Sequence, residues 1–473
     1  MTSEPIQKQA FLNRLPPEWP EDVLPSVRSQ LQSSQHKLVV LDDDPTGTQT
    51  IHDIAVLTEW PVDALASELR SDSPAFFLLT NSRSLPAPQA ANLNHDIAAN
   101  LIQAAAQTGQ DFAVISRSDS TLRGHFPGEV EALARGLGQS FDGWLLIPFF
   151  IEGGRYTIND VHYVAEGDVL TPAAETPFAQ DAAFGYRTSN LRAWVTEKTN
   201  GRIPLEAVES ISIDDIRLGG PAAIHHKLMR LSGGKLCIVN AASMRDMQVF
   251  VDGLLRAEAA GKRFLYRTAA SFVQARAGLV SHPLLTADNF DLPARGGGLV
   301  IVGSYVPKTT RQVEVLLNTT QVTAIEIDCN ALLDPARRAA TIESAAYSAK
   351  AALERDEDTV IYTSRDLINS SGSGASLAVG QQISAGLIAI LRRIETRPRY
   401  ILAKGGITSS DVATQGLDVK RALVRGQILP GVPVWQLGTE SRYPAMSYIV
   451  FPGNVGGDDA VATVVQALAR PGA

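Results

Sequence analysis

Short apolar runs alternate with helix-like stretches along most of this chain. The runs at 38–41 (LVVL), 75–79 (AFFLL) and 144–150 (WLLIPFF) have the length of buried strands. The stretches between such runs are rich in Ala and Leu, as at 88–108, and predict helices. Strands that alternate with helices are typical of a parallel sheet covered by helices. The pattern therefore predicts an α/β fold.

This alternation stops once and then starts again. A polar stretch with proline and glycine follows the first half and predicts a linker at 286–297. At 473 residues the chain is too long for one ordinary domain. We expect an N-terminal arm at 1–35, an α/β domain at 36–285 and a second α/β domain at 298–473. Each domain is expected to be a mainly parallel sheet flanked by helices, with an active-site cleft between the two domains.

Composition and charge exclude several classes of protein. The net charge of −8 argues against a nucleic-acid-binding protein, which needs a basic surface to pair with phosphates. The chain has no run of about 18 apolar residues, and its N-terminal stretch lacks the apolar core of a signal peptide. Cys237 and Cys329 stand alone in apolar runs, which predicts buried, reduced thiols and no zinc site. We therefore expect a cytoplasmic enzyme without a nucleic-acid or membrane partner.

Polar side chains gather where the predicted strands of the first half end. They occur at 42–44, 81–83, 117–123 and Arg155. Ligands of parallel α/β sheets bind just beyond the carboxyl ends of the strands, so these positions predict one shared site. The irregular stretch at 156–220 predicts a lid or a β-rich insert over the same face, followed by helices.

The first of these strand ends carries three adjacent carboxylates, Asp42, Asp43 and Asp44, followed by Thr46 and Gly47. Adjacent carboxylates repel one another, so a metal, a cationic side chain or a substrate hydroxyl is needed to compensate them. An exposed acidic turn in which an aspartate caps a helix is the alternative.

The segment 116–125 (SRSDSTLRGH) combines guanidinium, carboxylate and hydroxyl groups within ten residues. Arg117 and Arg123 predict bidentate binding of a carboxylate, while Asp119 and hydroxyls such as that of Ser120 suit a polyol. A capped turn with a surface Arg–Asp pair is the alternative.

Three glycine turns in the second half are candidates for binding phosphate. They follow predicted strands at 303–304, 404–408 and 451–457, and helices are predicted after each of them. Glycine lets backbone N–H groups approach phosphate oxygens, and a helix N-terminus adds partial positive charge. Each turn taken alone could simply end a strand or start a helix. The segment 303–310 lacks the second glycine of a Walker A loop, and no dinucleotide-binding glycine motif follows the first strand of either half.

Six motifs in this order resemble those of the four-carbon acid sugar kinases. They are LDDDPTGTQT, SRSDSTLRGH, GGRYTINDVHYV, GSYVPKTTRQ, KGGITSSD and FPGNVGG, and the resemblance covers nearly the whole chain from Lys37. It implies an acid-sugar-binding N-terminal domain and a nucleotide-binding C-terminal domain. The implied reaction is ATP-dependent phosphorylation of a hydroxyl of a small acid such as threonate, erythronate or an oxo-tetronate.

The resemblance also implies roles for individual residues. Asp43, Asp44, Arg117, Asp119 and Arg123 would line the sugar pocket, and Ser304, Gly405, Gly406, Ile407, Thr408 and Gly453 would contact ATP. To these we add Ser120 and Arg155 for the substrate and Gly456 for the nucleotide. Ile407 stands where many members have an acidic residue, and Phe451 stands where a lysine is often found.

We expect in-line phosphoryl transfer in which Asp44 or Asp43 deprotonates the acceptor hydroxyl; the motif leaves both open. Mg²⁺ is expected to travel with ATP and not to occupy a site of its own on the protein. Arg117, Arg123 and Arg155 are expected to hold the carboxylate. A nucleotide-independent, Mg-dependent lyase or hydrolase and a non-catalytic regulator that binds sugar acid and nucleotide are the alternatives. A homodimer is the ordinary expectation for assembly.

Overall fold

The computed structural model describes residues 6–34, 36–280, 282–304, 306–364 and 373–470. The chain forms two compact units. Unit 1 comprises Met1–Asp43 and Glu59–Ser281, and unit 2 comprises Asp44–Thr58 and His282–Ala473.

This division differs from the expected boundaries at the segment Asp44–Thr58, which we had placed in the first domain. Strand β3 (Ile54–Leu57) pairs antiparallel with β17 (Arg421–Leu429) of unit 2. The 3-10 helix η1 (Pro45–Thr48) precedes it, and the Trp435 indole N–H donates a buried hydrogen bond of 3.0 Å to the Thr48 hydroxyl. The segment therefore belongs to unit 2 because its backbone and side-chain partners lie there.

The sheet of unit 1 has the strand order β10-β11-β6-β12-β5-β2-β4, and all of its neighbouring strands are parallel. Its strands are β2 (Lys37–Asp42), β4 (Ala75–Leu79), β5 (Phe112–Arg117), β6 (Gly143–Ile147), β10 (Glu209–Ile211), β11 (Lys235–Val239) and β12 (Phe264–Thr268). The central strands are almost wholly buried on both faces, as their continuous apolar runs require.

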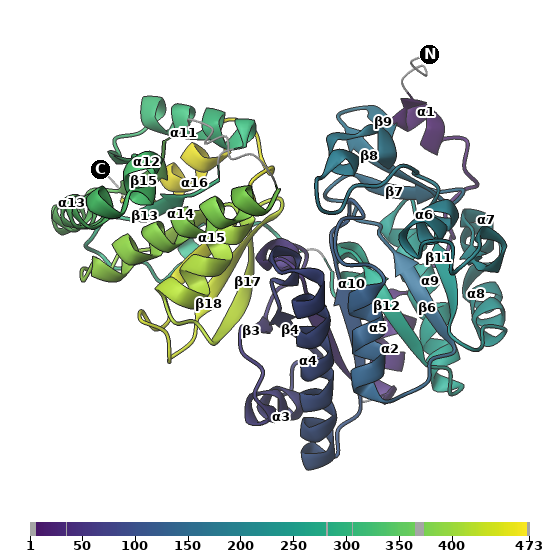
Figure 1. The fold of residues 1–473 in the computed structure, drawn as a ribbon. Helices are drawn as coiled ribbons and strands as arrows, with labels where there is room; N and C mark the ends of the chain where they lie inside the picture. Colours follow the sequence, from purple (N-terminus) through teal and green to yellow (C-terminus); the bar gives the residue numbers. More distant parts are fainter. Residues whose placement is uncertain (1–5, 35, 281, 305, 365–372, 471–473) are drawn as a thin grey trace. The chain divides into compact units, whose positions relative to one another are not determined.

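Two groups of helices cover this sheet (Figure 1). One group contains α3 (Val62–Arg70), α4 (Ala87–Thr108) and α5 (Gly128–Leu137). The other contains α2 (Leu24–Ser34), α7 (Ile213–Arg217), α8 (Gly220–Met229), α9 (Met244–Ala259) and α10 (Ala270–Arg276). The helices of each group contact one another. Connections between parallel strands are right-handed, so connections that run toward opposite edges of the sheet place their helices on opposite faces.

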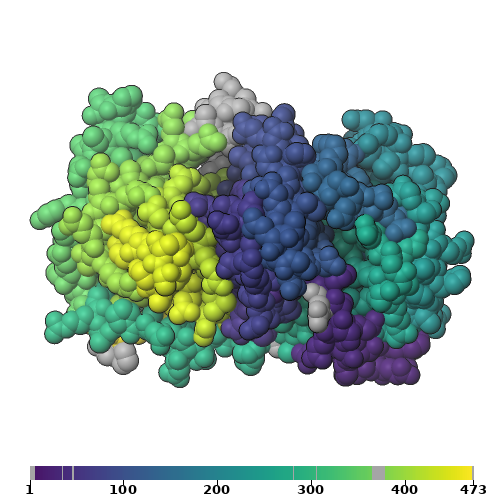
Figure 2. Space-filling view, turned by 90° about the horizontal axis from the view of Figure 1, so that it is seen from below, coloured from purple at the N-terminus to yellow at the C-terminus, as the bar shows by residue number. Residues whose placement is uncertain are grey.

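The N-terminal arm that we expected at 1–35 contains regular secondary structure. It contains β1 (Ile6–Gln7), α1 (Lys8–Leu12) and α2, and α2 packs against α9. Figure 2 shows this stretch in purple at the surface of unit 1.

The irregular stretch after residue 155 begins with a small antiparallel sheet, so it is a β-rich insert. Its strand order is β1-β9-β8-β7, with β7 (Arg155–Ile158), β8 (Val161–Glu166) and β9 (Val169–Pro172). The 3-10 helix η4 (Pro177–Gln180) and α6 (Leu191–Lys198) follow it.

Unit 2 has a mixed sheet with the strand order β3-β17-β18-β19-β16-β13-β15-β14. Five strands are parallel, namely β13 (Leu299–Val302), β14 (Thr323–Ile327), β15 (Thr359–Thr363), β16 (Ile401–Lys404) and β19 (Ser447–Phe451). β17, β18 (Val432–Leu437) and β3 extend this sheet with antiparallel pairs. The fold is therefore α/β in both units, with parallel strands in the majority.

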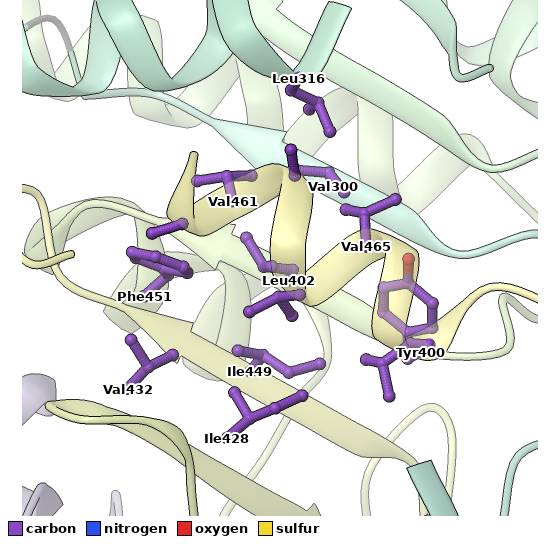
Figure 3. Close-up of a cluster of buried hydrophobic side chains, with 14 of the residues drawn as sticks. Val300, Leu316, Tyr400, Leu402, Ile428, Val432, Ile449, Phe451, Val461 and Val465 are labelled. Atoms are coloured by element: carbon purple, nitrogen blue, oxygen red, sulfur yellow. The ribbon is translucent and has the colours of Figure 1, made fainter. Parts of the chain in front are cut away.

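Helices α11 (Pro307–Thr319) and α16 (Ala460–Leu468) enclose one core of unit 2. Figure 3 shows Leu316 of α11 and Val461 and Val465 of α16 against Val300 and Leu402 of the sheet. A second helix group contains α12 (Cys329–Leu333), α13 (Pro335–Glu354), α14 (Ser373–Arg393), α15 (Gly406–Asp411) and the π-helix η7 (Val412–Gly416).

The two cysteines, Cys237 and Cys329, are buried and free, as predicted. Among the helices of the described residues, none combines the length and the apolar character that a membrane-spanning helix needs.

Candidate functional site

The buried ion pair of Asp42 and Arg117 marks the carboxyl ends of β2 and β5. The two residues are register partners, and Arg117 donates to Asp42 Oδ1 at 3.2 Å. Burial raises the pKa of Asp42 to about 7, although the Arg117 guanidinium opposes this shift. The pair is therefore a structural contact below the candidate site. We had predicted that Arg117 binds substrate, but its guanidinium group is bound to Asp42.

Asp43 is the buried carboxylate next in sequence. It is 3% exposed, and neither of its oxygens has a hydrogen-bond partner among the described residues. Gly124, at φ +118°, passes close by: a Cβ there would lie 3.3 Å from Asp43 Oδ2 and 3.4 Å from the Arg267 guanidinium. A buried carboxylate that accepts no hydrogen bond is costly, so Asp43 is suited to accept one from a ligand hydroxyl.

Asp119 lies between two arginines. Its carboxylate accepts a 2.8 Å hydrogen bond from Arg123 Nε and lies 3.5 Å from Arg83, and it also accepts from the Thr121 hydroxyl. Burial alone would raise the pKa of Asp119, but Arg123 and Arg83 hold it well below its usual range. The predicted Arg–Asp cluster is therefore a largely buried network that fixes the direction of Arg123.

Arg123 and Arg155 both place their guanidinium groups on the ring of Phe178. The guanidinium carbons lie 5.2 Å and 5.5 Å from the ring centroid. Asp181, which follows η4, lies 3.7 Å from Arg123. Burial lowers the pKa of Arg155, and its Nε has no hydrogen-bond partner among the described residues. Two partly buried guanidinium groups on one ring are suited to bind a carboxylate.

The backbone of the 119–124 loop is held by side chains from three other elements. His162 Nε2 lies 2.7 Å from the Ser120 carbonyl oxygen, so this nitrogen carries the donated proton; burial lowers the pKa of His162 to about 4. The Tyr186 hydroxyl donates to the Thr121 carbonyl at 2.8 Å, and Arg267 donates to the Arg123 carbonyl at 3.0 Å. The loop contains the buried Leu122 at φ +70°, a conformation that persists only when its surroundings impose it. Ser120 therefore lies in this loop, and its carbonyl oxygen accepts one of the hydrogen bonds that hold the loop in place.

Arg267 and Glu129 complete the buried charges around Asp43. The Arg267 guanidinium lies 5.6 Å from the ring centroids of both Phe126 and Trp194. Burial lowers the pKa of Arg267, and the carboxylates of Asp43 and Glu129 oppose this shift. Burial, with the negative charge of Asp43, raises the pKa of Glu129.

Sequence reasoning missed several of these residues. Arg267 is the next-to-last residue of strand β12, so the strand-end rule that selected Arg117 could also have selected it. Phe178, Asp181 and Tyr186 lie in the irregular stretch, where no periodicity pointed to them.

The three glycine turns of unit 2 meet around Ser304. A Cβ atom on Gly405 would lie 2.9 Å from the Ser304 Cβ, and a Cβ on Gly453 would lie 3.4 Å from the Ser304 Oγ. A Cβ on Gly303 would lie 2.4 Å from Thr408 Oγ1, so only glycine fits there without a shift. The predicted nucleotide-binding residues Ser304, Gly405, Thr408 and Gly453 are therefore neighbours.

The third turn is fastened to α11. The Thr309 hydroxyl donates to the Gly453 carbonyl at 3.1 Å, and Gln312 Nε2 donates to the carbonyls of Val455 and Gly457 at 3.0 Å and 2.7 Å. Gly456, at φ +81°, lies between these two acceptors. The turn is thus held from behind by side chains of the helix.

The turn at 404–408 also differs in detail from its expected form. Helix α15 begins at Gly406, inside the turn at 404–408, whereas we had predicted a helix after this turn. The Gly405 N–H donates to the Phe451 carbonyl at 2.8 Å, so this glycine serves the turn's conformation at φ +115°. Ile407 is 50% exposed. Asp44 lies beside the turn, because a Cβ on Gly406 would be 3.0 Å from its Oδ2.

Two family models match this chain. A model of a sugar-binding N-terminal domain matches residues 38–276, and a model of a nucleotide-binding C-terminal domain matches residues 299–461. The chain belongs to the four-carbon acid sugar kinase family. In this member of the family the charged network of unit 1 lies within the sugar-binding match, and the turns around Ser304 lie within the nucleotide-binding match.

A curated relative of this chain is the D-erythronate kinase of Heliobacterium modesticaldum. It is 24% identical over 467 residues, which cover 91% of this chain and 97% of the relative. Solved structures from Salmonella typhimurium LT2 and Haemophilus influenzae are each 19% identical to this chain, with TM-scores of 0.64 and 0.60. The first alignment covers 90% of this chain and 97% of the solved chain, and the second covers 91% and 100%. These two structures share the fold.

Proposed function

We propose that this chain is an ATP-dependent kinase that phosphorylates a hydroxyl group of a four-carbon acid sugar. The observation that carries the proposal is the group formed by Arg123, Arg155 and Phe178 near Asp43, whose charge acts on Arg123. The group offers guanidinium donors for a carboxylate and a carboxylate acceptor for a hydroxyl. Threonate, erythronate and oxo-tetronate each carry a carboxylate and hydroxyl groups on one short carbon chain. D-Erythronate is the first acid to test, because a relative bears that name.

We assign carboxylate binding to Arg123 and Arg155. Arg117 is paired with Asp42 and its side chain is buried. Arg155 has a buried Nε without a hydrogen-bond partner among the described residues, and Arg123, whose Nε binds Asp119, has further N–H donors. Charge-assisted hydrogen bonds to a carboxylate contribute about 1.5–3 kcal/mol each, enough to orient a small acid. Phe178 packs against both guanidinium groups and limits the directions that they can take.

We assign acceptance of the hydroxyl proton to Asp43. Its unpartnered oxygens lie in unit 1 with the proposed carboxylate-binding arginines, whereas Asp44 lies beside Gly406 in unit 2. The Arg267 guanidinium interacts with the charge of Asp43, and the Asp43 carboxylate oxygens are the acceptor atoms that general-base catalysis requires. Asp44 would then help to shape the nucleotide turn.

The residues around Ser304 fit a polyphosphate. Gly406, Ile407 and Thr408 form the first turn of α15, where backbone N–H groups have no acceptor within the helix. Gly303 and Gly405 leave the turns without side chains that would block their approach. When bound, ATP with Mg²⁺ supplies the phosphoryl group and neutralises its charge.

A coupled assay of ADP release with a panel of four-carbon acids tests the proposal. We expect acid-dependent ADP release with a phosphorylated acid as the product, identified by mass spectrometry. Erythritol, which lacks the carboxylate of erythronate, is the matched control and should be a much poorer substrate. Absence of ADP release with every acid, or a product that forms without nucleotide, would contradict the proposal.

A further inference from the structure

Lys404 is a buried cation directly behind the glycine turns of unit 2. It is the last residue of β16, it is the register partner of Phe451 on β19, and its side chain is 0% exposed. Its Nζ donates to the carbonyl oxygens of Pro452 and Gly453 at 2.6 Å and 3.2 Å. The same nitrogen lies 4.2 Å from the centroid of the Phe451 ring.

The charge of Lys404 has no counter-ion in the part of the chain that the structure describes. No carboxylate of these residues forms an ion pair with it, and its polar contacts are the two carbonyl oxygens. Burial, assisted by the positive charge of Lys308 in the first turn of α11, lowers the pKa of Lys404 to about 7. The carboxylate of Asp44 lies beside Gly406 at the same turn. The pKa of Lys404 is nevertheless lowered, because burial and the charge of Lys308 outweigh any opposing charge. A buried ammonium group of this kind is poised to change its protonation when an anion arrives.

The proposed phosphate site and Lys404 share one backbone group. The Gly453 carbonyl that accepts from Lys404 also accepts from the Thr309 hydroxyl, which in turn lies 3.2 Å from the Ser304 hydroxyl. The ammonium is therefore one peptide unit behind the turn, on the inner side, where it cannot touch a ligand itself. The protein interior between the Lys404 ammonium and the turn has a low dielectric constant, so the positive charge still attracts an anion bound at the turn.

We propose that Lys404 is the buried counter-charge for the nucleotide polyphosphate, and that nucleotide binding to unit 2 is coupled to uptake of a proton by this lysine. The inference rests on the proposed function in one respect, that the nucleotide phosphates bind at the turns around Ser304. Lys404 is then a positioning residue, because it acts on the nucleotide through the backbone of Pro452 and Gly453 and through the electrostatic field of its ammonium group.

The sign of the coupling follows from the charges. Without nucleotide, Lys404 is about half protonated at pH 7, because its pKa is about 7. A polyphosphate nearby favours the charged form and raises the pKa, and a rise of about two units lies within the range for an opposite charge. Binding would then take up about 0.1 proton at pH 6, about 0.5 at pH 7 and about 0.8 at pH 8. The dissociation constant would rise about five-fold from pH 7 to pH 8.

The test is isothermal titration calorimetry of the full chain with ADP and Mg²⁺. Titrations in two buffers with very different ionisation enthalpies, at pH 6, 7 and 8, give the number of protons taken up. The reference is Lys404→Gln, whose amide keeps a donor to the two carbonyls but removes the charge. We expect the difference in uptake between wild type and Lys404→Gln to grow from pH 6 to pH 8 as stated. Lys350→Gln, on the surface of α13 in the same unit, is the matched control and should behave as wild type.

Two further measurements keep the test decisive if Lys404→Gln does not fold. Lys404→Arg keeps a charge that does not titrate, so it should bind ADP without the extra uptake at pH 8. Wild type alone should take up protons at pH 8, where the phosphates of ADP no longer titrate. ADP binding with no proton uptake at pH 8 would overturn the role of Lys404 and leave the kinase proposal standing. Failure of wild type to bind ADP at any pH would overturn the proposed function itself.

Discussion

In unit 1 the candidate site is built from charged side chains at strand ends, whereas in unit 2 it is built from backbone turns. The charges of unit 1 occur largely as pairs, such as Asp42 with Arg117 and Asp119 with Arg123. Unit 2 has glycines where side chains would block the turns, and a buried cation, Lys404, lies behind them. A short acid presents a carboxylate and hydroxyls that fork-like side chains recognise, while a polyphosphate presents many equivalent oxygens that backbone N–H groups bind.

His162 of unit 1 and Lys404 of unit 2 titrate in different pH ranges. Burial lowers the pKa of His162 in unit 1 from 6.5 to about 4. The stability that this histidine contributes is present above 6.5 and lost as the pH falls through 4. Burial lowers the pKa of Lys404 in unit 2 from 10.5 to about 7, so the corresponding contribution is present above 10.5 and lost as the pH falls through 7. Below pH 6 the contribution of His162 therefore declines in a range where Lys404 no longer changes its charge, while Asp42, with its pKa raised to about 7, acts in the opposite direction.

The largest expected effect separates the two aspartates that the sequence left open. Asp43→Asn should lower kcat by about 10²–10⁴ because the proton acceptor is lost, with ADP affinity unchanged. Asp44→Asn should change the KM for ATP more than kcat, because Asp44 lies beside Gly406. Steady-state kinetics with calorimetry of ADP binding measures both. Equal losses of kcat in the two variants would break the division of roles between the units.

The next effect concerns the stability of unit 1 in acid. His162→Gln should remove a loss of about 2–3 kcal/mol in unfolding free energy between pH 7.5 and pH 4.5, because the neutral histidine no longer has to be protonated. Asp42 acts in the opposite direction, since its raised pKa makes acid stabilising. The informative quantity is therefore the difference between variant and wild type in chemical denaturation at the two pH values. An identical pH dependence of both proteins would show that His162 is not held neutral.

A substitution of Arg155 tests whether the guanidinium groups that pack on Phe178 bind the carboxylate of the acid. Arg155→Gln should raise the KM for the acid about 10- to 100-fold, since a charge-assisted hydrogen bond of about 1.5–3 kcal/mol is lost. Little stability should be lost, because Arg155 forms no ion pair among the described residues. Arg187→Gln, at a side chain that is 90% exposed, is the control and should leave the KM unchanged. A larger effect at Arg187 than at Arg155 would place the acid elsewhere.

The smallest effects compare two glycines of unit 2. Gly405→Ala should destabilise the chain by roughly 1–3 kcal/mol, because its φ of +115° is unsuited to alanine and the new methyl would meet Ser304. Gly380→Ala in α14 should instead stabilise the chain by roughly 0.5–1 kcal/mol, because its Cβ would meet nothing within 4 Å. Urea denaturation measures both, and a stabilising Gly405→Ala would show that the turn does not need its glycine.

The sequence was sufficient to predict contacts between residues that are close along the chain, and contacts between residues that lie at the ends of neighbouring parallel strands. Asp119 and Arg123 are four residues apart, and strand ends predicted the common location of Asp42 and Arg117. It was insufficient where the outcome depends on a distant partner: nothing near residue 50 reveals that β3 pairs with β17. The burial of Lys404 was equally hidden, since a lysine at a strand end has the same letters whether it faces a ligand or the carbonyls behind it.

The pairing of β3 with β17 has a consequence for the synthesis of the chain. Leu57 is the register partner of Arg421, so β3 leaves the ribosome about 360 residues before its hydrogen-bonding neighbour. At roughly 5–20 residues per second, this apolar strand waits about 20–70 s for its partner. During that interval the apolar segment Ile54–Leu57 lacks its partner strand of unit 2. Unit 2 therefore cannot be completed from its C-terminal part alone, and a fragment that starts at the linker would present β17 as a bare edge to other chains.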